Sequence, residues 1–255
     1  MESPYFAAWA PGGSYHVYNR AVALNRMFCN WYNVSKFRAV LRERVCPFFA
    51  VYSLSLVGNH YHLHGRVRSV GEIEAYLRSG VRLSAWQRKY LGGEASFQQL
   101  VGDAFARAFQ GYSRSFNIQQ GRAGTLMDQT MRRIRVRGDL LSRTLCAYHH
   151  FNPHKHGQWR GAGGLGGLTT YAEIVAGQSE LVDMAAVYGR FGGVEGFIAF
   201  HEAYLRRKRA ALERLDEGMY FGYEGHGERF GYELHRGERF RDNERWAGEL
   251  MEDEA

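Results

Sequence analysis

The strongest constraint on the fold is a pair of β-rich runs joined by one turn signal. Residues 48–57 (FFAVYSLSLV) are rich in β-branched and aromatic side chains, and residues 60–68 (HYHLHGRVR) alternate polar with apolar positions. Gly58 and Asn59, which separate them, are residue types that favour tight turns. Two such runs joined by two residues predict an antiparallel hairpin.

Three histidines occupy alternate positions in the second run. His60, His62 and His64 share one face of a strand because successive side chains point to opposite faces, and Tyr61 and Leu63 face the other way. Imidazoles two residues apart on a strand can bind one cation, with metal–nitrogen distances of about 2.0–2.1 Å. A polar strand face hydrogen-bonded to the backbone explains the same spacing. The short pattern leaves both interpretations open.

The other periodicities predict a mixture of strands and helices. Alternation of side-chain character predicts further strands over 14–22 and 130–138. The spacing of apolar residues predicts helices over 33–45, 96–121 and 139–153, and Pro153 is expected to stop the last of them. Residues 69–93 combine helix and loop, and a smaller helical region follows around 169–204.

The predicted helix over 139–153 carries one notable stripe. Leu141, Leu145, Tyr148 and Asn152 follow helical spacing, so inward packing of the two leucines would bring Tyr148 and Asn152 together near the helix end. A buried phenol beside an amide is explained equally well as a hydrogen-bonded pair. The chemical alternative is a tyrosine nucleophile acting on a phosphodiester whose charge a metal neutralises, with Asn152 as an oxygen ligand.

Charge is unevenly distributed along the chain. The net charge is +7, but residues 205–255 hold 10 Lys/Arg against 13 Asp/Glu, which leaves a body of +10 and a tail of −3. A basic body suggests a polyanionic partner such as nucleic acid. Arginines interleaved with aromatic residues suit single-stranded or hairpin DNA, although a solvated basic face over a phenylalanine core is the alternative. The candidate DNA-binding residues are Arg114, Arg122, Arg132, Arg133 and Arg135.

The remaining composition bounds the organisation of the chain. No run of 18 apolar residues predicts a membrane span, the first residues lack the pattern of a signal peptide, and the three scattered cysteines suit a reduced cytoplasmic protein. We expect a main domain over 1–160, a small helical extension over 161–204 and a charged, poorly ordered tail over 205–255. The glycine-rich stretch 161–167 marks the first boundary.

Five segments together form a pattern that is far more specific than any single motif. In chain order they are YHVYNR (15–20), VGNHYHL (57–63), YSRSFNIQQGRAGTL (112–126), YHHFNPHKHG (148–157) and FGGVEGFIAFH (191–201). With these segments the chain from about 14 to about 204 resembles the single-tyrosine HUH transposases, in particular the REP-associated tyrosine transposases.

The resemblance implies both a fold and a reaction. The fold would be an α+β ferredoxin-like antiparallel sheet with packed helices. His60 and His62 would be the pair that binds Mg²⁺ or Mn²⁺, Asn152 the third metal ligand and Tyr148 the nucleophile. The reaction would cleave and rejoin single-stranded, hairpin-containing DNA through a 5′-phosphotyrosine link. Whether such an enzyme acts as a monomer or a homodimer stays open.

Rival functions and the remaining histidines complete the expectations. The rivals are a catalytically silent DNA-binding or regulatory protein of this fold, a water-using metal-dependent phosphodiesterase, and a plain nucleic-acid-binding module with structural histidines. His16 and His64 are expected to be structural or to border the site or the DNA. A polar surround that meets phosphate is expected from His149, His150, His154 and His156.

Overall fold

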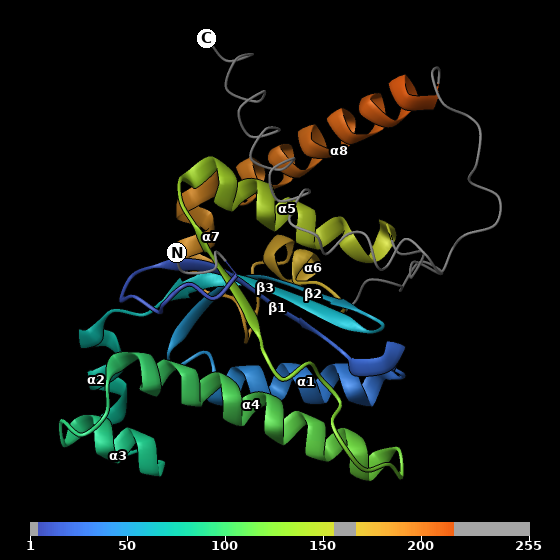
Figure 1. The fold of residues 1–255 in the computed structure, drawn as a ribbon. Coiled ribbons are helices and arrows are strands. Elements are labelled where there is room, and N and C mark those ends of the chain that lie inside the picture. Colours follow the sequence, from blue (N-terminus) through green and yellow to red (C-terminus); the bar gives the residue numbers. More distant parts are fainter. Residues whose placement is uncertain (1–4, 156–166, 217–255) are drawn as a thin grey trace.

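The computed structural model describes residues 5–155 and 167–216, and its centre is a four-stranded antiparallel sheet of order β2-β3-β1-β4 (Figure 1). The strands are β1 (Ser14–Arg20), β2 (Phe49–Val57), β3 (His60–Val67) and β4 (Arg132–Val136). Helix α1 (Trp31–Arg44) connects β1 to β2, and α4 (Phe97–Gln119) lies between β3 and β4. This connectivity is that of a ferredoxin-like unit. The predicted α+β class, with an antiparallel sheet and packed helices, is confirmed.

The hairpin predicted over 48–68 is present and sets the register of the sheet. Val57 pairs with His60 across the turn, and on the other side of β3 the register pairs His62 with Tyr18 of β1. The ladder between β2 and β3 shifts between Val51 and Ser53, which indicates a β-bulge. A bulge inserts an extra residue and re-aims the side chains around it.

One face of the sheet is covered by α1 and α4, with the shorter α2 (Val70–Leu77) and α3 (Ala85–Leu91) on the same side (Figure 1). Tyr61 and Leu63 are fully buried in this layer. The Tyr61 ring lies 5.0 Å from that of Phe37 and 5.1 Å from that of Phe109, centroid to centroid. The aromatic face of β3 is therefore committed to packing, and the histidines face the other way as predicted.

The histidine face is covered by α5 (Asp139–Lys155), α6 (Tyr171–Val175), α7 (Met184–Phe191) and α8 (Val194–Asp216) (Figure 1). A second apolar core joins Tyr52 and Cys146 to residues of these later helices, among them Val187 and Phe197. The described part of the predicted extension thus shares a core with the sheet, and α8 continues beyond the expected boundary at 204. Residues 161–166 of the glycine-rich stretch and the tail after 216 lie outside the described residues.

The prediction that Pro153 stops the fifth helix is wrong. Helix α5 continues to Lys155 with Pro153 inside it. A proline inside a helix removes a hydrogen bond and costs about 3 kcal/mol. Here Pro153 is buried in the last turn. Packing of that turn therefore outweighs the local preference.

Residues 69–93, expected as helix and loop, form α2 and α3. Each helix begins with a capping box, in which Ser69 and Ser84 accept a hydrogen bond from the backbone three residues on. A short 3-10 helix, Val22–Leu24, follows β1. Within the described ranges, no helix has the length and apolar character needed to cross a membrane.

Candidate functional site

The site is built around His60 and His62, which project from β3 toward α5. Both side chains are nearly buried, with exposed fractions of 8% and 6%. Their ring centroids lie 5.0 Å apart and the rings are almost perpendicular. Strand alternation places the two imidazoles on one face, as the spacing predicts.

One nitrogen of each ring is held by a neighbour. Nδ1 of His60 donates to Oδ1 of Asn59 at 2.8 Å. Nδ1 of His62 shares a hydrogen bond of 2.9 Å with Nε2 of His16 on β1. A hydrogen bond from one ring nitrogen fixes the tautomer of a histidine and leaves the lone pair on the other nitrogen, as in many metal sites. The bond to the Asn59 oxygen makes Nδ1 the donor in His60, and in the His62 tautomer that also carries its proton on Nδ1, Nε2 of both rings is the atom that could bind a cation.

His64, the third histidine of the run, has a structural role through its hydrogen bonds. Nδ1 donates to the carbonyl oxygen of Tyr15 at 3.1 Å, and Nε2 bonds to Oγ of Ser142 on α5 at 2.8 Å. Burial lowers the pKa of His64 to about 4. Because both nitrogens are engaged, His64 ties the sheet to α5.

Tyr148 lies on α5 beside the histidine pair. Its ring centroid is 5.9 Å from that of His62, edge to face, and the side chain is partly exposed. Two other phenols are near enough for Tyr148 to contribute electrostatically to raising their pKa values, Tyr18 on β1 and Tyr204 on α8. Burial raises the pKa of Tyr18 to about 12, and nearby Arg132 acts in the opposite direction. Among these three phenols, Tyr148 is the one whose ring lies edge-on to His62 on the helix side.

Asn152 lies one turn beyond Tyr148 and is almost completely buried. Its exposed fraction is 1%. Neither amide atom has a hydrogen-bond partner among the described residues. A buried amide without a partner is costly, and such groups usually mark a bound water, an ion or a functional role.

The face of α5 that meets the sheet is one residue out of step with the predicted stripe. Ser142, Cys146 and His149, at spacings of four and three, are all at most 1% exposed. Ser142 bonds to His64, and Nδ1 of His149 bonds to Oγ of Ser53 at 2.9 Å. The β-bulge in β2 turns Ser53 toward α5 and so provides this partner.

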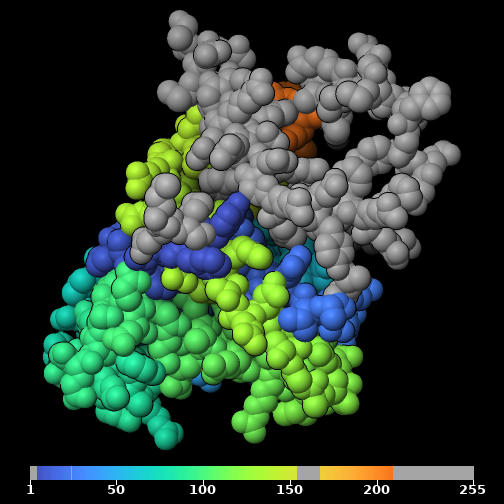
Figure 2. Space-filling model, in the orientation of Figure 1, coloured from blue at the N-terminus to red at the C-terminus, as the bar shows by residue number. Residues whose placement is uncertain are grey.

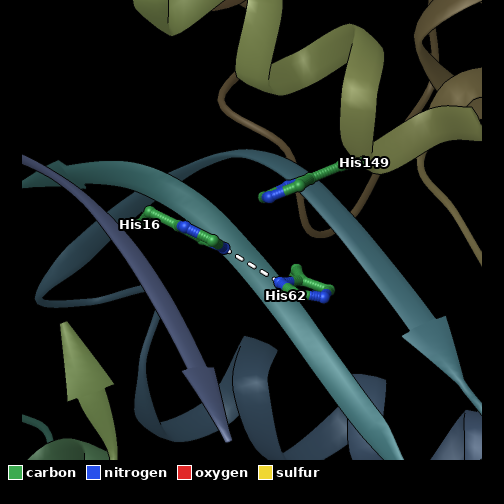
Figure 3. A group of neighbouring side chains, drawn as sticks. All are labelled: His16, His62 and His149. Atoms are coloured by element: carbon green, nitrogen blue, oxygen red, sulfur yellow. Dashed lines mark hydrogen bonds between the residues drawn. The ribbon is translucent and has the colours of Figure 1, made fainter. Parts of the chain in front are cut away.

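A group of three buried imidazoles lies between α5 and the sheet. His16, His62 and His149 each place a ring nitrogen within 4.8 Å of the other two, a spacing that could hold a metal ion (Figure 3). Burial lowers the pKa of His16 to about 3 and that of His149 well below its usual value. Neutral imidazole is the form that binds metals, and burial favours it for His16 and His149. No local spacing in the sequence links His16 or His149 to the His60–His62 pair.

His149 and His150 do not form the polar surround that the sequence suggested, because both are buried. Nδ1 of His150 bonds to Nε2 of His201 at 2.8 Å, and Nε2 of His150 bonds to Oγ1 of Thr170 at 3.0 Å. Nδ1 of His201 donates to the carbonyl oxygen of Phe197. This chain of bonds fastens α5 to α8. His154 and His156 are not among the side chains that the structure describes.

The candidate DNA-binding arginines separate by position. Arg132 pairs with Tyr18 in the register of β4 on β1, and its guanidinium lies 5.9 Å from the Tyr18 ring on the histidine face. Arg133 and Arg135 face the opposite side, over the rings of Trp9 and Tyr15.

The other two candidates, Arg114 and Arg122, lie on α4 and in the loop after it. Figure 2 shows α4 in green on the half of the molecule away from α5 and α8. Arg114 is exposed, and Arg122 donates to the carbonyl oxygen of Thr125 at 3.1 Å. Of the five arginines, Arg132 is the one that strand alternation places on the side of Tyr148.

Comparison with known proteins gives one structural similarity. No protein family and no curated protein matches the sequence. A solved structure described as "the REP associates tyrosine transposase bound to a REP hairpin" is similar with a TM-score of 0.41 and 14% identity, over 69% of this chain and 86% of that chain. Similarity at this level assigns neither a family nor an activity.

Proposed function

We propose that this protein is a metal-dependent DNA strand transferase that cleaves and rejoins single-stranded DNA through Tyr148. The observation that carries the proposal is the juxtaposition of the Tyr148 ring with His62, 5.9 Å away, beside a histidine pair whose Nδ1 atoms are both engaged. The substrate class, hairpin-containing single-stranded DNA, comes from the resemblance of the sequence motifs to single-tyrosine HUH transposases.

The residues present fit the divalent cation that such a reaction needs. His60 and His62 would hold it through Nε2, and Asn152, whose buried amide oxygen has no partner among the described residues, would add an oxygen ligand. Mixed nitrogen and oxygen ligands suit Mn²⁺. They can also hold Mg²⁺, which would keep more coordinated water molecules. Such an ion, when bound, neutralises charge on the phosphate oxygens.

The chain's own residues then carry the chemistry. The phenol oxygen of Tyr148 attacks the phosphorus, the bond to the 3′ oxygen breaks, and a 5′-phosphotyrosine link and a free 3′ hydroxyl result. The phenolic proton can leave to solvent through the partly exposed side of Tyr148, and the departing 3′ oxygen takes up a proton from solvent to become the hydroxyl. Attack by a 3′ hydroxyl on the phosphotyrosine reverses the exchange and needs no external energy source. Arg132 lies on the same face as Tyr18, which supports the proposal that it contacts a phosphate of the strand.

A covalent-trapping experiment tests the proposal. The protein is mixed with labelled single-stranded hairpins from the flanks of its gene, with Mg²⁺ or Mn²⁺, and run on a denaturing gel. Wild type should form a protein–DNA adduct, whereas Tyr148→Phe and His60→Ala should not. Tyr18→Phe and Tyr204→Phe are the matched controls, because each removes a neighbouring phenol and should leave an adduct.

Each other outcome selects a rival function. Cleaved DNA without an adduct would identify a water-using phosphodiesterase. Binding with neither cleavage nor adduct, over several flanking sequences, would identify a DNA-binding protein that lacks the reaction. An adduct that survives Tyr148→Phe and disappears with Tyr18→Phe would move the nucleophile to β1.

A further inference from the structure

His149 brings a ring nitrogen without a partner into the space between α5 and the sheet. The side chain is fully buried, and Nδ1 is held by Ser53 at 2.9 Å. Nε2 has no hydrogen-bond partner among the described residues. A buried polar atom in this state calls for a ligand or another explanation.

The neighbours of that ring are two more buried imidazoles. Figure 3 shows His149 reaching from α5 toward the hydrogen-bonded pair formed by His16 on β1 and His62 on β3. Each ring has a nitrogen within 4.8 Å of the other two. Three nitrogens bound to one Zn²⁺ at tetrahedral angles lie roughly 3.3 Å apart, so small ring movements would close the set on an ion.

We propose that His16, His62 and His149 form a second metal site, for a transition metal ion such as Zn²⁺, whose occupation excludes the cation of the proposed reaction. The exclusion of the reaction's cation rests on the proposed function, whereas the existence of the second metal site does not.

The ligand chemistry of this site differs from that of the first. Three imidazole nitrogens suit Zn²⁺, Ni²⁺ or Cu²⁺, whereas Mg²⁺ prefers oxygen ligands and keeps most of its water. Three protein ligands leave a fourth position for a water molecule. The site should therefore bind Zn²⁺ and ignore Mg²⁺.

Competition follows because His62 belongs to both sites. A neutral imidazole has one nitrogen with a lone pair and one that carries the proton. Binding through Nδ1 of His62 moves its proton to Nε2, which then has no lone pair for the cation shared with His60. In the tautomer in which Nδ1 of His62 donates to Nε2 of His16, that Nε2 keeps its lone pair and needs no proton movement. Zinc would thus act as an inhibitor that switches the tautomer of one ligand.

The test is a zinc titration of the metal-free full-length chain against a chromophoric chelator. His149→Asn is the informative variant, because an asparagine can keep a polar group where Nδ1 meets Ser53 but lacks Nε2. It should weaken the tightest zinc equivalent at least about tenfold, an effect that even an outer partner of a ligand can produce. His16→Ala, on another element, should do the same. His60→Ala should change the affinity by less than about twofold.

The outcomes separate the two sites. Loss of the tight equivalent in His60→Ala, with retention in His149→Asn, would place zinc on the His60–His62 pair and refute the proposal, and equal binding by all variants would refute it too. Far-UV circular dichroism identifies any variant that fails to fold, in which case the other of the two variants decides.

A second arm repeats the adduct gel with added Zn²⁺. Wild type should lose its adduct, and His149→Asn should retain it. Absence of any adduct without zinc would count against the proposed function alone, since the titration is read without DNA.

Discussion

Acid should unfold this protein steeply, because several histidines whose hydrogen bonds hold α5 in place are buried in neutral form. Burial lowers the pKa of His64 and His201 to about 4 each, and that of His150 well below its usual value. The unfolded chain titrates near pH 6.5. Below that pH the unfolded state binds protons that the folded state does not bind, so the free energy of unfolding decreases as the pH is lowered.

The magnitude follows from linkage. Each such histidine contributes a slope of about 1.4 kcal/mol per pH unit between its unfolded and folded pKa values. Three such histidines give a slope of about 4 kcal/mol per pH unit. Over about two to three pH units the lost free energy is comparable with the whole stability of an ordinary domain. His150 and His201 share one hydrogen bond, so a single proton on the pair would reduce this figure.

Urea unfolding followed by circular dichroism at pH 7.5, 6.5, 5.5 and 5.0 measures the slope directly. The matched variant is His201→Gln, which keeps a polar group near the position that bonds to His150 but does not titrate. Its stability at pH 7.5 should be somewhat lower, and its slope should be smaller by about 1.4 kcal/mol per pH unit. Stability that stays constant from pH 7 to pH 5, or an unchanged slope in His201→Gln, would refute the reasoning.

Three further predictions concern single positions. Arg132→Ala should weaken binding of single-stranded DNA and reduce the slope of log Kd against log salt concentration by about 0.7, as expected for one phosphate contact. The control variant Arg133→Ala loses packing on Trp9 and should mainly lower the melting temperature. Fluorescence anisotropy at several salt concentrations distinguishes the two variants. Gly65→Ala should destabilise by about 1–3 kcal/mol or more because its Cβ would lie 2.2 Å from a backbone oxygen, while Gly71→Ala, in open space on α2, should be neutral or stabilising in a thermal melt. Asn152→Leu should raise the free energy of unfolding of the metal-free protein by about 1–3 kcal/mol, because it removes a buried amide without a partner among the described residues. It should also weaken Mn²⁺ binding in a calorimetric titration. A loss of stability would mean that the amide is hydrogen-bonded in the folded protein.

Much of the fold could be predicted because its elements have clear local periodicities. The β2–β3 hairpin, the long helix α4 and the shared face of His60 and His62 follow from alternation, helical spacing and one turn signal. The misplaced end of α5 has the same origin. Pro153 locally favours a helix end, but burial of the last turn decided the outcome.

The candidate site was predicted only in part, for a reason that concerns helix rotation. The stripe through Leu145 and Tyr148 correctly brought Tyr148 to the histidines, but the residues that meet the sheet are Ser142, Cys146 and His149. A stripe one residue away is only about a quarter of a turn round a helix. Ser142 and His149 are polar, so the spacing of apolar residues does not indicate that they face the sheet.

The sequence by itself determined which side chains share a face of each strand and helix, because those relations depend on fixed local geometry. Tertiary structure decided which partners the ring nitrogens of the histidines meet. The register of β1 on β3 brings His16 to His62 across 46 residues, and a bulge in β2 aims Ser53 at His149. Pairing register and helix rotation are set by packing between distant segments, which no local pattern records.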